Sequence, residues 1–156
     1  SYAFLWGHKQ EQTPTWYGLF TKEGNATQSI DVLNSCWGNN HRNRAPILHS
    51  FLLNNKDKKE SVKIKRGKDC VFTYEVTDPD NDSLKYEFQL MPESTDKKSG
   101  GDFEKTPEPI SFKVVENSNH KITIKSPKKP GAYRFFIYIR DGNKNIATAN
   151  IPFYVN

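Results

Sequence analysis

The sequence lacks long hydrophobic runs: no stretch approaches the ~18 apolar residues that a membrane-spanning helix requires. It has only two cysteines and no Cys-x-x-Cys, which excludes a disulfide-based scaffold and a cysteine-bound zinc. It also contains no Gly-rich phosphate loop, no Gly-x-Ser-x-Gly and no His-Glu-x-x-His, and its four histidines show no ligand spacing. We therefore expect no cofactor and no membrane span.

Charge of one sign is not concentrated in any part of the chain. The net charge is +5, from 23 basic and 18 acidic residues, and the lysines are interleaved with acids. A nucleic-acid-binding face would gather more Lys and Arg, so we expect no nucleic-acid partner. The two thiols, Cys36 and Cys70, lie at apolar positions, which favours two small buried side chains; a bridge between them is the alternative.

Aromatic residues are abundant at 13%, and their distribution divides the chain near residue 45. All three tryptophans precede that point. Residues 1–45 predict a strand buried on both faces at 2–6, a polar loop, a second extended piece at 15–20, and a helix at 26–37 with Asn25 as N-cap. About 40 residues bury too little surface to fold alone, so this segment must pack on something.

Residues 46–156 show the period-two alternation of half-buried strands. The predicted strands are 47–53, 62–64, 70–76, 84–90, 110–114, 122–124, 133–140 and 147–155, with a long polar loop over 92–109. The fold class is therefore mainly β: an Ig-like antiparallel β-sandwich preceded by a short strand-loop-helix segment. Phe136 and Tyr138 face outward, and we expect them to be buried against the first segment rather than to form an exposed glycan-binding strip.

One turn carries an acidic cluster. Asp78, Asp80 and Asp82 alternate around Pro79, and such oxygen-rich clusters can bind calcium. In a tight turn, however, the same carboxylates cap backbone amides, and this second interpretation is favoured. We expect no metal site, with these three residues as the weak candidates.

Residues 74–88, which hold the Asp-Pro-Asp-Asn-Asp turn between two alternating strands, resemble bacterial Ig-like modules of the PKD and cadherin-like type. The final hairpin, from Gly131 to Asn143, fits the same pattern. Asn81 stands where such turns usually have Gly, and Asn tolerates the left-handed conformation. Modules of this kind serve as spacers, adhesins and occasional glycan binders, so the resemblance implies a fold and little about function.

Residues 1–20, Ser-Tyr-Ala-Phe-Leu-Trp-Gly-His-Lys-Gln-Glu-Gln-Thr-Pro-Thr-Trp-Tyr-Gly-Leu-Phe, resemble the end of a TIM-barrel glycoside hydrolase of the family 2-like kind. The resemblance continues to residue 46 and implies that helix 26–37 is the eighth barrel helix. It implies that Trp6 floors a sugar site, with His8 beside it at the barrel mouth. The two catalytic carboxylates of such enzymes come from earlier strands, so we expect no catalytic residue in this chain. Glu11, the acid nearest Trp6, has no visible partner.

The sequence therefore predicts the C-terminal part of a secreted bacterial glycoside hydrolase that acts in polysaccharide breakdown. Residues 1–45 would be the terminal βα segment of the barrel, and 46–156 an accessory or spacer domain in a secreted, periplasmic or cell-surface protein. The alternative is a non-catalytic carbohydrate-binding or adhesion module. In either case the partner is a carbohydrate. The segment before residue 45 is expected to dock on the sandwich or to self-associate, with Trp37 in the contact.

Overall fold

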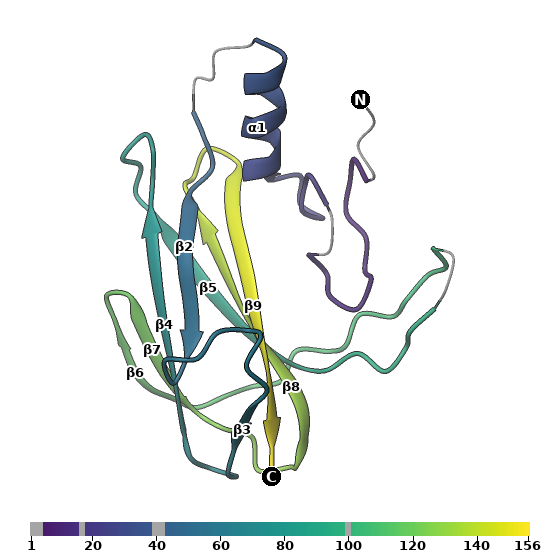
Figure 1. The fold of residues 1–156 in the computed structure, drawn as a ribbon, viewed down its shortest axis with the longest axis vertical. Coiled ribbons are helices and arrows are strands. Elements are labelled where there is room, and N and C mark those ends of the chain that lie inside the picture. Colours follow the sequence, from purple (N-terminus) through teal and green to yellow (C-terminus); the bar gives the residue numbers. More distant parts are fainter. Residues whose placement is uncertain (1–4, 16–17, 39–42, 99–100) are drawn as a thin grey trace.

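The computed structural model describes residues 5–15, 18–38, 43–98 and 101–156. Their secondary structure is one short helix and nine strands. In chain order these are β1 (Ala26–Thr27), α1 (Gln28–Cys36), β2 (Ile47–Leu53), β3 (Val62–Ile64), β4 (Asp69–Thr77), β5 (Lys85–Pro92), β6 (Val114–Ser118), β7 (Lys121–Lys125), β8 (Gly131–Arg140) and β9 (Asn145–Val155). Figure 1 shows α1 at one end of the strands and the C-terminus at the other.

Two sheets face each other and make a β-sandwich, as the alternating sequence predicts. One sheet has the order β1-β9-β8-β5, with β3 also pairing with β9, and the other has the order β2-β4-β7-β6. The long pairs β8–β9, β5–β8 and β2–β4 are antiparallel. The two short strands β1 and β3 each pair with β9 in parallel, at its start and at its end.

The main core lies between the sheets and is built around aromatic rings. Phe72 of β4 stacks on Phe135 of β8 with ring centroids 4.1 Å apart, and both rings are fully buried. Phe88 stacks on the same Phe135 at 5.8 Å. Because each ring buries roughly 150–250 Å², a few such contacts supply much of the apolar burial that a chain of low overall hydrophobicity needs.

β8 differs from its neighbours because it is covered on both faces. Every residue from Phe135 to Ile139 is buried, including the outward-facing Phe136 and Tyr138. These two form a second apolar cluster with Met91 and Ile146, and their rings stack with centroids 6.2 Å apart. Antiparallel sandwich strands usually leave one face to solvent, so the outer face of this sheet has a cover. The expected burial of Phe136 and Tyr138 is confirmed.

Most of the predicted strands are present, and the differences fall at the ends of elements. The helix begins at Gln28 rather than at residue 26, because Ala26 and Thr27 pair with β9; Thr27 is the N-cap in place of Asn25. The strand predicted at 110–114 is wrong: Ile110 makes an isolated bridge to Leu90, and β6 begins only at Val114. Residues 114–118 are all exposed, so they lack the apolar alternation that would have revealed them.

The N-terminal predictions fare less well. Residues 2–4 of the predicted first strand, and residues 16–17 of the second extended piece, lie outside the described residues. Leu5 and Trp6 are not in a strand, and Trp6 is 61% exposed, so burial on both faces is wrong for these positions. Trp37 is 57% exposed, so its predicted burial against the sandwich is wrong, while self-association through this ring stays a prediction.

The two cysteines have different surroundings. Cys70 is fully buried in the main core, whereas Cys36 is exposed at the last turn of α1, and both are free thiols. The prediction of two buried thiols is therefore correct for Cys70 and wrong for Cys36. Burial raises the pKa of the Cys70 thiol to about 12. Among the described residues, no helix has both the length and the apolar character needed to cross a membrane.

Candidate functional site

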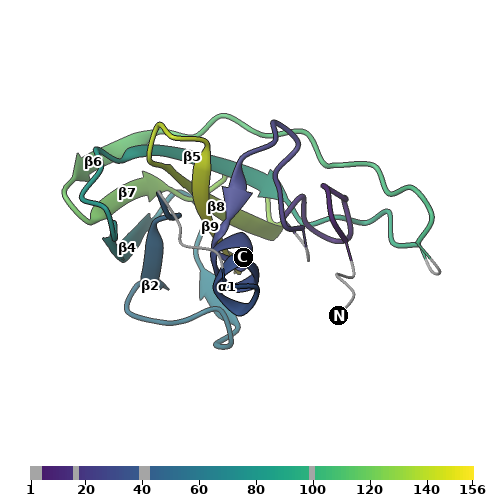
Figure 2. The same ribbon diagram turned by 90° about the horizontal axis from the view of Figure 1, so that it is seen from above.

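The N-terminal segment (the described residues 5–15 and 18–27) lies against the outer face of the sheet that contains β5 and β8. Figures 1 and 2 both show it on the same side of the sandwich as the long loop over residues 93–109. Its C-terminal end is fixed by β1, where the Ala26 N–H donates to the Lys144 carbonyl over 2.8 Å and Thr27 donates to Leu19. Leu19 itself is buried, so this end of the segment is part of the fold.

The other end of the segment is held by the long loop. The Glu104 carboxylate, a buried group, accepts the Gln12 N–H at 2.7 Å and the Lys98 N–H at 3.0 Å. The Thr106 hydroxyl donates to the Gln10 side-chain carbonyl over 3.2 Å. These backbone donors, first Gln12 and then Lys98, lower the pKa of Glu104. The charged carboxylate therefore ties the segment and the loop to each other.

Between the segment, the loop and the sheet runs a groove of about 1040 Å³. Many polar residues line it, among them His8, Gln10 and Glu23 from the segment and Glu87, Tyr138 and Arg140 from the sheet. Arg140 donates to Glu87 over 2.8 Å, and its guanidinium lies 5.8 Å from the centre of the Tyr138 ring. The groove thus offers an imidazole, carboxylates, an amide and a guanidinium within one enclosure.

Two side chains of this groove, Glu23 and Tyr138, have shifted pKa values. The pKa of Glu23 is lowered, first by its own backbone N–H and then by the Thr21 hydroxyl and the charge of Arg140, although partial burial opposes the shift. Burial, reinforced by Glu87 and Glu23, raises the pKa of Tyr138 to about 12. Tyr138 therefore keeps its proton and acts as a hydrogen-bonding hydroxyl on an apolar ring.

One polar atom in the groove has no partner. The side chain of Gln10 is buried, and its Nε2 makes no hydrogen bond to any of the described residues. A buried amide without a partner is costly, and this one lines the groove. A ligand that brings a hydroxyl or carbonyl oxygen into the groove would satisfy it.

Of the two residues that the sequence assigned to sugar binding, His8 lines this groove and Trp6 does not. His8 is half-buried and lines it, while Trp6 packs against Phe20 with ring centroids 5.4 Å apart and presents the rest of its ring to solvent. Glu11 is paired with Lys9, whose Nζ lies 2.9 Å from its carboxylate, and does not line the groove. The sugar-binding roles of Trp6 and His8 stay predictions. Sequence reasoning missed two other lining residues, Gln10 and Glu104, whose polar loops carry no recognisable pattern.

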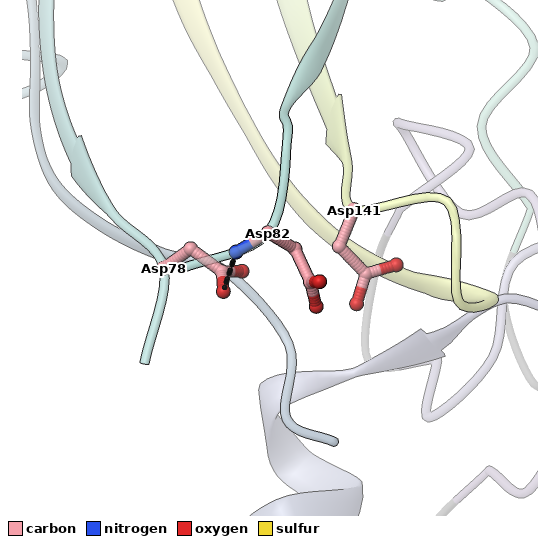
Figure 3. Close-up of side chains that lie close together, drawn as sticks. All are labelled: Asp78, Asp82 and Asp141. Carbon is pink, nitrogen blue, oxygen red and sulfur yellow. Dashed lines mark hydrogen bonds between the residues drawn. The ribbon is translucent and has the colours of Figure 1, made fainter. Parts of the chain in front are cut away.

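A carboxylate cluster, Asp78, Asp82 and Asp141, lies at the end of the sandwich next to α1 (Figure 3). One oxygen from each lies within 4.8 Å of the others. Asp78 follows β4, Asp82 precedes β5 and Asp141 follows β8, so the two turns bring them together. Of the sequence candidates, Asp80 is not a member, because its carboxylate accepts the Arg44 N–H at 2.7 Å.

Amide donors surround this carboxylate cluster. Asp78 caps the turn by accepting the N–H groups of Asp80 and Asp82 at 3.0 and 2.9 Å, and Asn81 between them has a φ of +60°. The turn interpretation and the left-handed Asn81 are therefore both confirmed. Asp82 accepts from the side chains of Asn43 and Asn143.

The third carboxylate, Asp141, is buried, and both of its oxygens accept hydrogen bonds. It accepts the backbone N–H groups of Asn143 and Asn145 at 2.7 and 3.1 Å, and the side-chain amide of Asn145 at 2.7 Å. Asn145 also donates to Asn43 over 2.7 Å, which fixes the start of the linker to β2. Sequence reasoning missed Asp141, since it lies about 60 residues beyond the Asp78 turn; the Asp-Gly-Asn of its own turn was the available signal.

This arrangement can act in two ways. As described, it is a hydrogen-bonded clamp that joins two turns to the linker before β2. The Asp78 Oδ2 is buried and has no hydrogen-bond partner among the described residues, so Asp78, Asp82 and Asp141 are also the residues that could hold a cation. The expectation that the chain has no metal site stays a prediction.

Comparisons with known proteins give limited information. No family model matches the chain, and no curated protein matches it. The solved structures similar to it include a nucleoside hydrolase-related hypothetical protein from Saccharophagus degradans that is associated with carbohydrate metabolism, with a TM-score of 0.44 and 20% identity. The match covers 73% of this chain and 26% of that one.

Two smaller β proteins match over a similar span. The copper resistance protein PcoC from Escherichia coli has a TM-score of 0.39 and 18% identity, over 72% of this chain and 99% of that one. The PmoD soluble domain from Methylocystis has a TM-score of 0.37 and 11% identity, over 75% of this chain and 94% of that one. Likenesses at this level carry no argument about function. None of the three structures named here is described as a TIM-barrel glycoside hydrolase.

Proposed function

We propose that this chain is the C-terminal part of a secreted bacterial glycoside hydrolase that acts in polysaccharide breakdown. Residues 1–45 would be the last βα segment of a TIM barrel, and residues 46–156 an accessory sandwich that supports it. The catalytic carboxylates would come from barrel strands outside this chain, as the resemblance of residues 1–46 implies.

One observation carries the proposal: the N-terminal segment is attached to the sandwich at both of its ends and still exposes large apolar side chains. Glu104 holds Gln12, and β1 pairs with β9. Trp6, Val32 and Trp37 are nevertheless more than half exposed, and α1 has no fully buried residue. A helix with exposed apolar residues of this size normally packs against a neighbour, and the rest of a barrel is the neighbour that the resemblance supplies.

The groove lined by His8 suits a saccharide. A flat exposed indole can stack on the apolar face of a sugar ring, and the polar lining of the groove can exchange hydrogen bonds with its hydroxyl groups. Within such an enzyme, Trp6 and His8 would contact substrate, and the Ig-like domain would hold the segment that presents them.

The test compares the chain alone with the whole natural protein that contains it. Against a panel of aryl glycosides and polysaccharides, we expect the whole protein to hydrolyse at least one substrate and the chain alone to hydrolyse none. In the whole protein, Trp6→Ala should raise KM, because an aromatic platform is lost. Tyr154→Ala, at an aromatic residue of β9 that is 47% exposed and does not line the groove, is the matched control and should leave KM unchanged.

Two results would refute the proposal. One is the absence of barrel strands carrying a carboxylate pair in the whole protein. The other is turnover by the chain alone that is lost on Glu11→Gln. If instead the chain alone binds an insoluble polysaccharide through Trp6 and the whole protein has no hydrolytic activity, the protein is a carbohydrate-binding or adhesion module.

A further inference from the structure

A second hollow, of about 1140 Å³, opens at the end of the sandwich opposite α1. It lies between the end of β5, residues 110–113 and the β7–β8 connection; β8 begins here, at Gly131, which pairs with Val155 near the C-terminus (Figure 1). Its volume exceeds the ~300–1,000 Å³ that encloses a drug-sized molecule. It can therefore accept more than one small ring.

The floor of this hollow is apolar and held by the core. Leu90 and Tyr133 are buried, and the Tyr133 hydroxyl donates to the Lys129 carbonyl over 2.8 Å. Phe112 packs edge-on against Phe135 with ring centroids 5.5 Å apart. Because these rings are anchored by the core, the floor is formed before any ligand arrives.

A buried hydroxyl without a partner lines the same hollow. Ser94 is 5% exposed, and its Oγ makes no hydrogen bond to any part of the chain that the structure describes. The nearby Ser126, which is also buried, is satisfied, since its hydroxyl donates to the Lys65 carbonyl over 2.9 Å. Buried hydroxyls in folded proteins are normally paired, so Ser94 marks a position where a ligand atom would complete the hydrogen bonding.

The rim of the hollow is positively charged. Four lysines line it: Lys113, Lys125, Lys128 and Lys129. Lys125 is paired with Asp69 at 2.6 Å, whereas the other three have no ion pair among residues 5–15, 18–38, 43–98 and 101–156. The one acid in the lining, Glu93, is neutralised by Arg134 through contacts of 3.0 and 2.6 Å. The field at the opening therefore favours an anion.

We infer that this hollow binds an acidic oligosaccharide, of the kind built from uronic acids. The apolar faces of the sugar rings would lie on the Tyr133 and Phe112 floor, a sugar hydroxyl would pair with Ser94, and carboxylates would meet the lysine rim. The choice of a saccharide rests on the proposed function, while the choice of an anion rests on the lysine rim alone.

The experiment measures the affinity of the chain for a galacturonic acid pentamer by isothermal titration calorimetry, with cellopentaose as the neutral probe. The acidic sugar should bind, the neutral one should bind at least tenfold more weakly, and the affinity should fall with added salt. Lys128→Gln with Lys129→Gln should weaken binding about tenfold, and Ser94→Ala should weaken it by ~2–10-fold, as for a lost hydrogen bond. The matched control is Lys58→Gln with Lys59→Gln, an adjacent lysine pair elsewhere that makes the same change in charge.

Four results would overturn the inference: no binding of the acidic pentamer, equal binding of cellopentaose, an equal effect of the two lysine double variants, or no effect of Ser94→Ala. A poly-glutamate peptide that binds in place of the sugar would identify an acidic peptide as the ligand and refute the saccharide. Hydrolysis by the whole protein is a separate measurement, so the failure of this site and the failure of the proposed function are distinguishable.

Discussion

The apolar cluster on the outer face of β8 allows a quantitative prediction about the stability of the fold. Phe136 points away from the main core yet is only 2% exposed, because it packs with Met91, Tyr138 and Ile146. If this second cluster is a true core, Phe136→Ala removes a buried ring. If it is a loose surface contact, the substitution costs almost nothing.

The magnitude follows from the area that the ring buries. A phenylalanine buries on the order of 200 Å², and at ~25 cal/mol per Å² this gives about 5 kcal/mol as an upper value. Measured Phe→Ala substitutions in cores cost ~3–5 kcal/mol. We therefore expect the free energy of unfolding to fall by ~3–5 kcal/mol. A domain of this size loses ~2–4 °C in Tm per kcal/mol, so Tm should fall by ~6–20 °C.

The assay is urea unfolding followed by circular dichroism, with Phe103→Ala as the matched control. Phe103 is the same residue type but 83% exposed, so its replacement should change stability by less than ~0.5 kcal/mol. In limited proteolysis, the protease should also cleave residues 5–25 faster in the Phe136→Ala variant than in the unchanged chain. A loss below ~1 kcal/mol for Phe136→Ala would refute the view that Met91, Phe136, Tyr138 and Ile146 form a true second core.

Three further predictions concern groups with unusual surroundings. At neutral pH a thiol reagent should label the exposed Cys36 at once, whereas Cys70, which is buried and has a pKa of about 12, should react only on unfolding. Mass spectrometry follows the labelling, and equal rates at the two thiols would contradict the prediction. The pKa of Glu104 is lower in the folded than in the unfolded chain, so its contribution to stability is present above the unfolded value of ~4.3 and is lost as the pH falls through the lowered value. Proteolysis of the N-terminal segment by an acid-active protease should therefore accelerate below pH ~4, and Glu104→Gln should show fast cleavage at every pH. Calcium should not raise Tm, since amide donors already occupy the carboxylate cluster; a rise that Asp141→Asn abolishes would reveal a cation site there.

How far the sequence predicted the fold depended on how local each signal was. The alternation of Cys70, Phe72 and Tyr74 identifies β4 because each side chain's face follows from its position in the strand. β6 was misplaced because all its residues are exposed, so no burial pattern marks it. The first residues were assigned to a barrel strand because Trp6 completes an apolar run, but in the structure its ring remains open to solvent.

The candidate sites were predicted less completely, because they join residues that are distant along the chain. The Asp78 turn was recognised, but its meeting with Asp141 depends on two turns at the same end of the sandwich. The hydrogen bond from Gln12 to Glu104 spans 92 positions. Sequence patterns relate residues a few positions apart, so they cannot predict this hydrogen bond, which forms because the folded chain brings the two loops together.

The sequence by itself determined the sandwich, its aromatic core and the left-handed turn at Asn81, because strand alternation and turn chemistry act over a few neighbouring residues. Only the tertiary structure decided that Met91 and Ile146 pack with the outward rings of β8 and that Glu104 ties the N-terminal segment to the long loop. It also decided that Trp6, Val32 and Trp37 stay exposed. The physical reason is that burial and charge pairing depend on which segments meet. That choice is made by the packing of the whole chain rather than by any stretch of it.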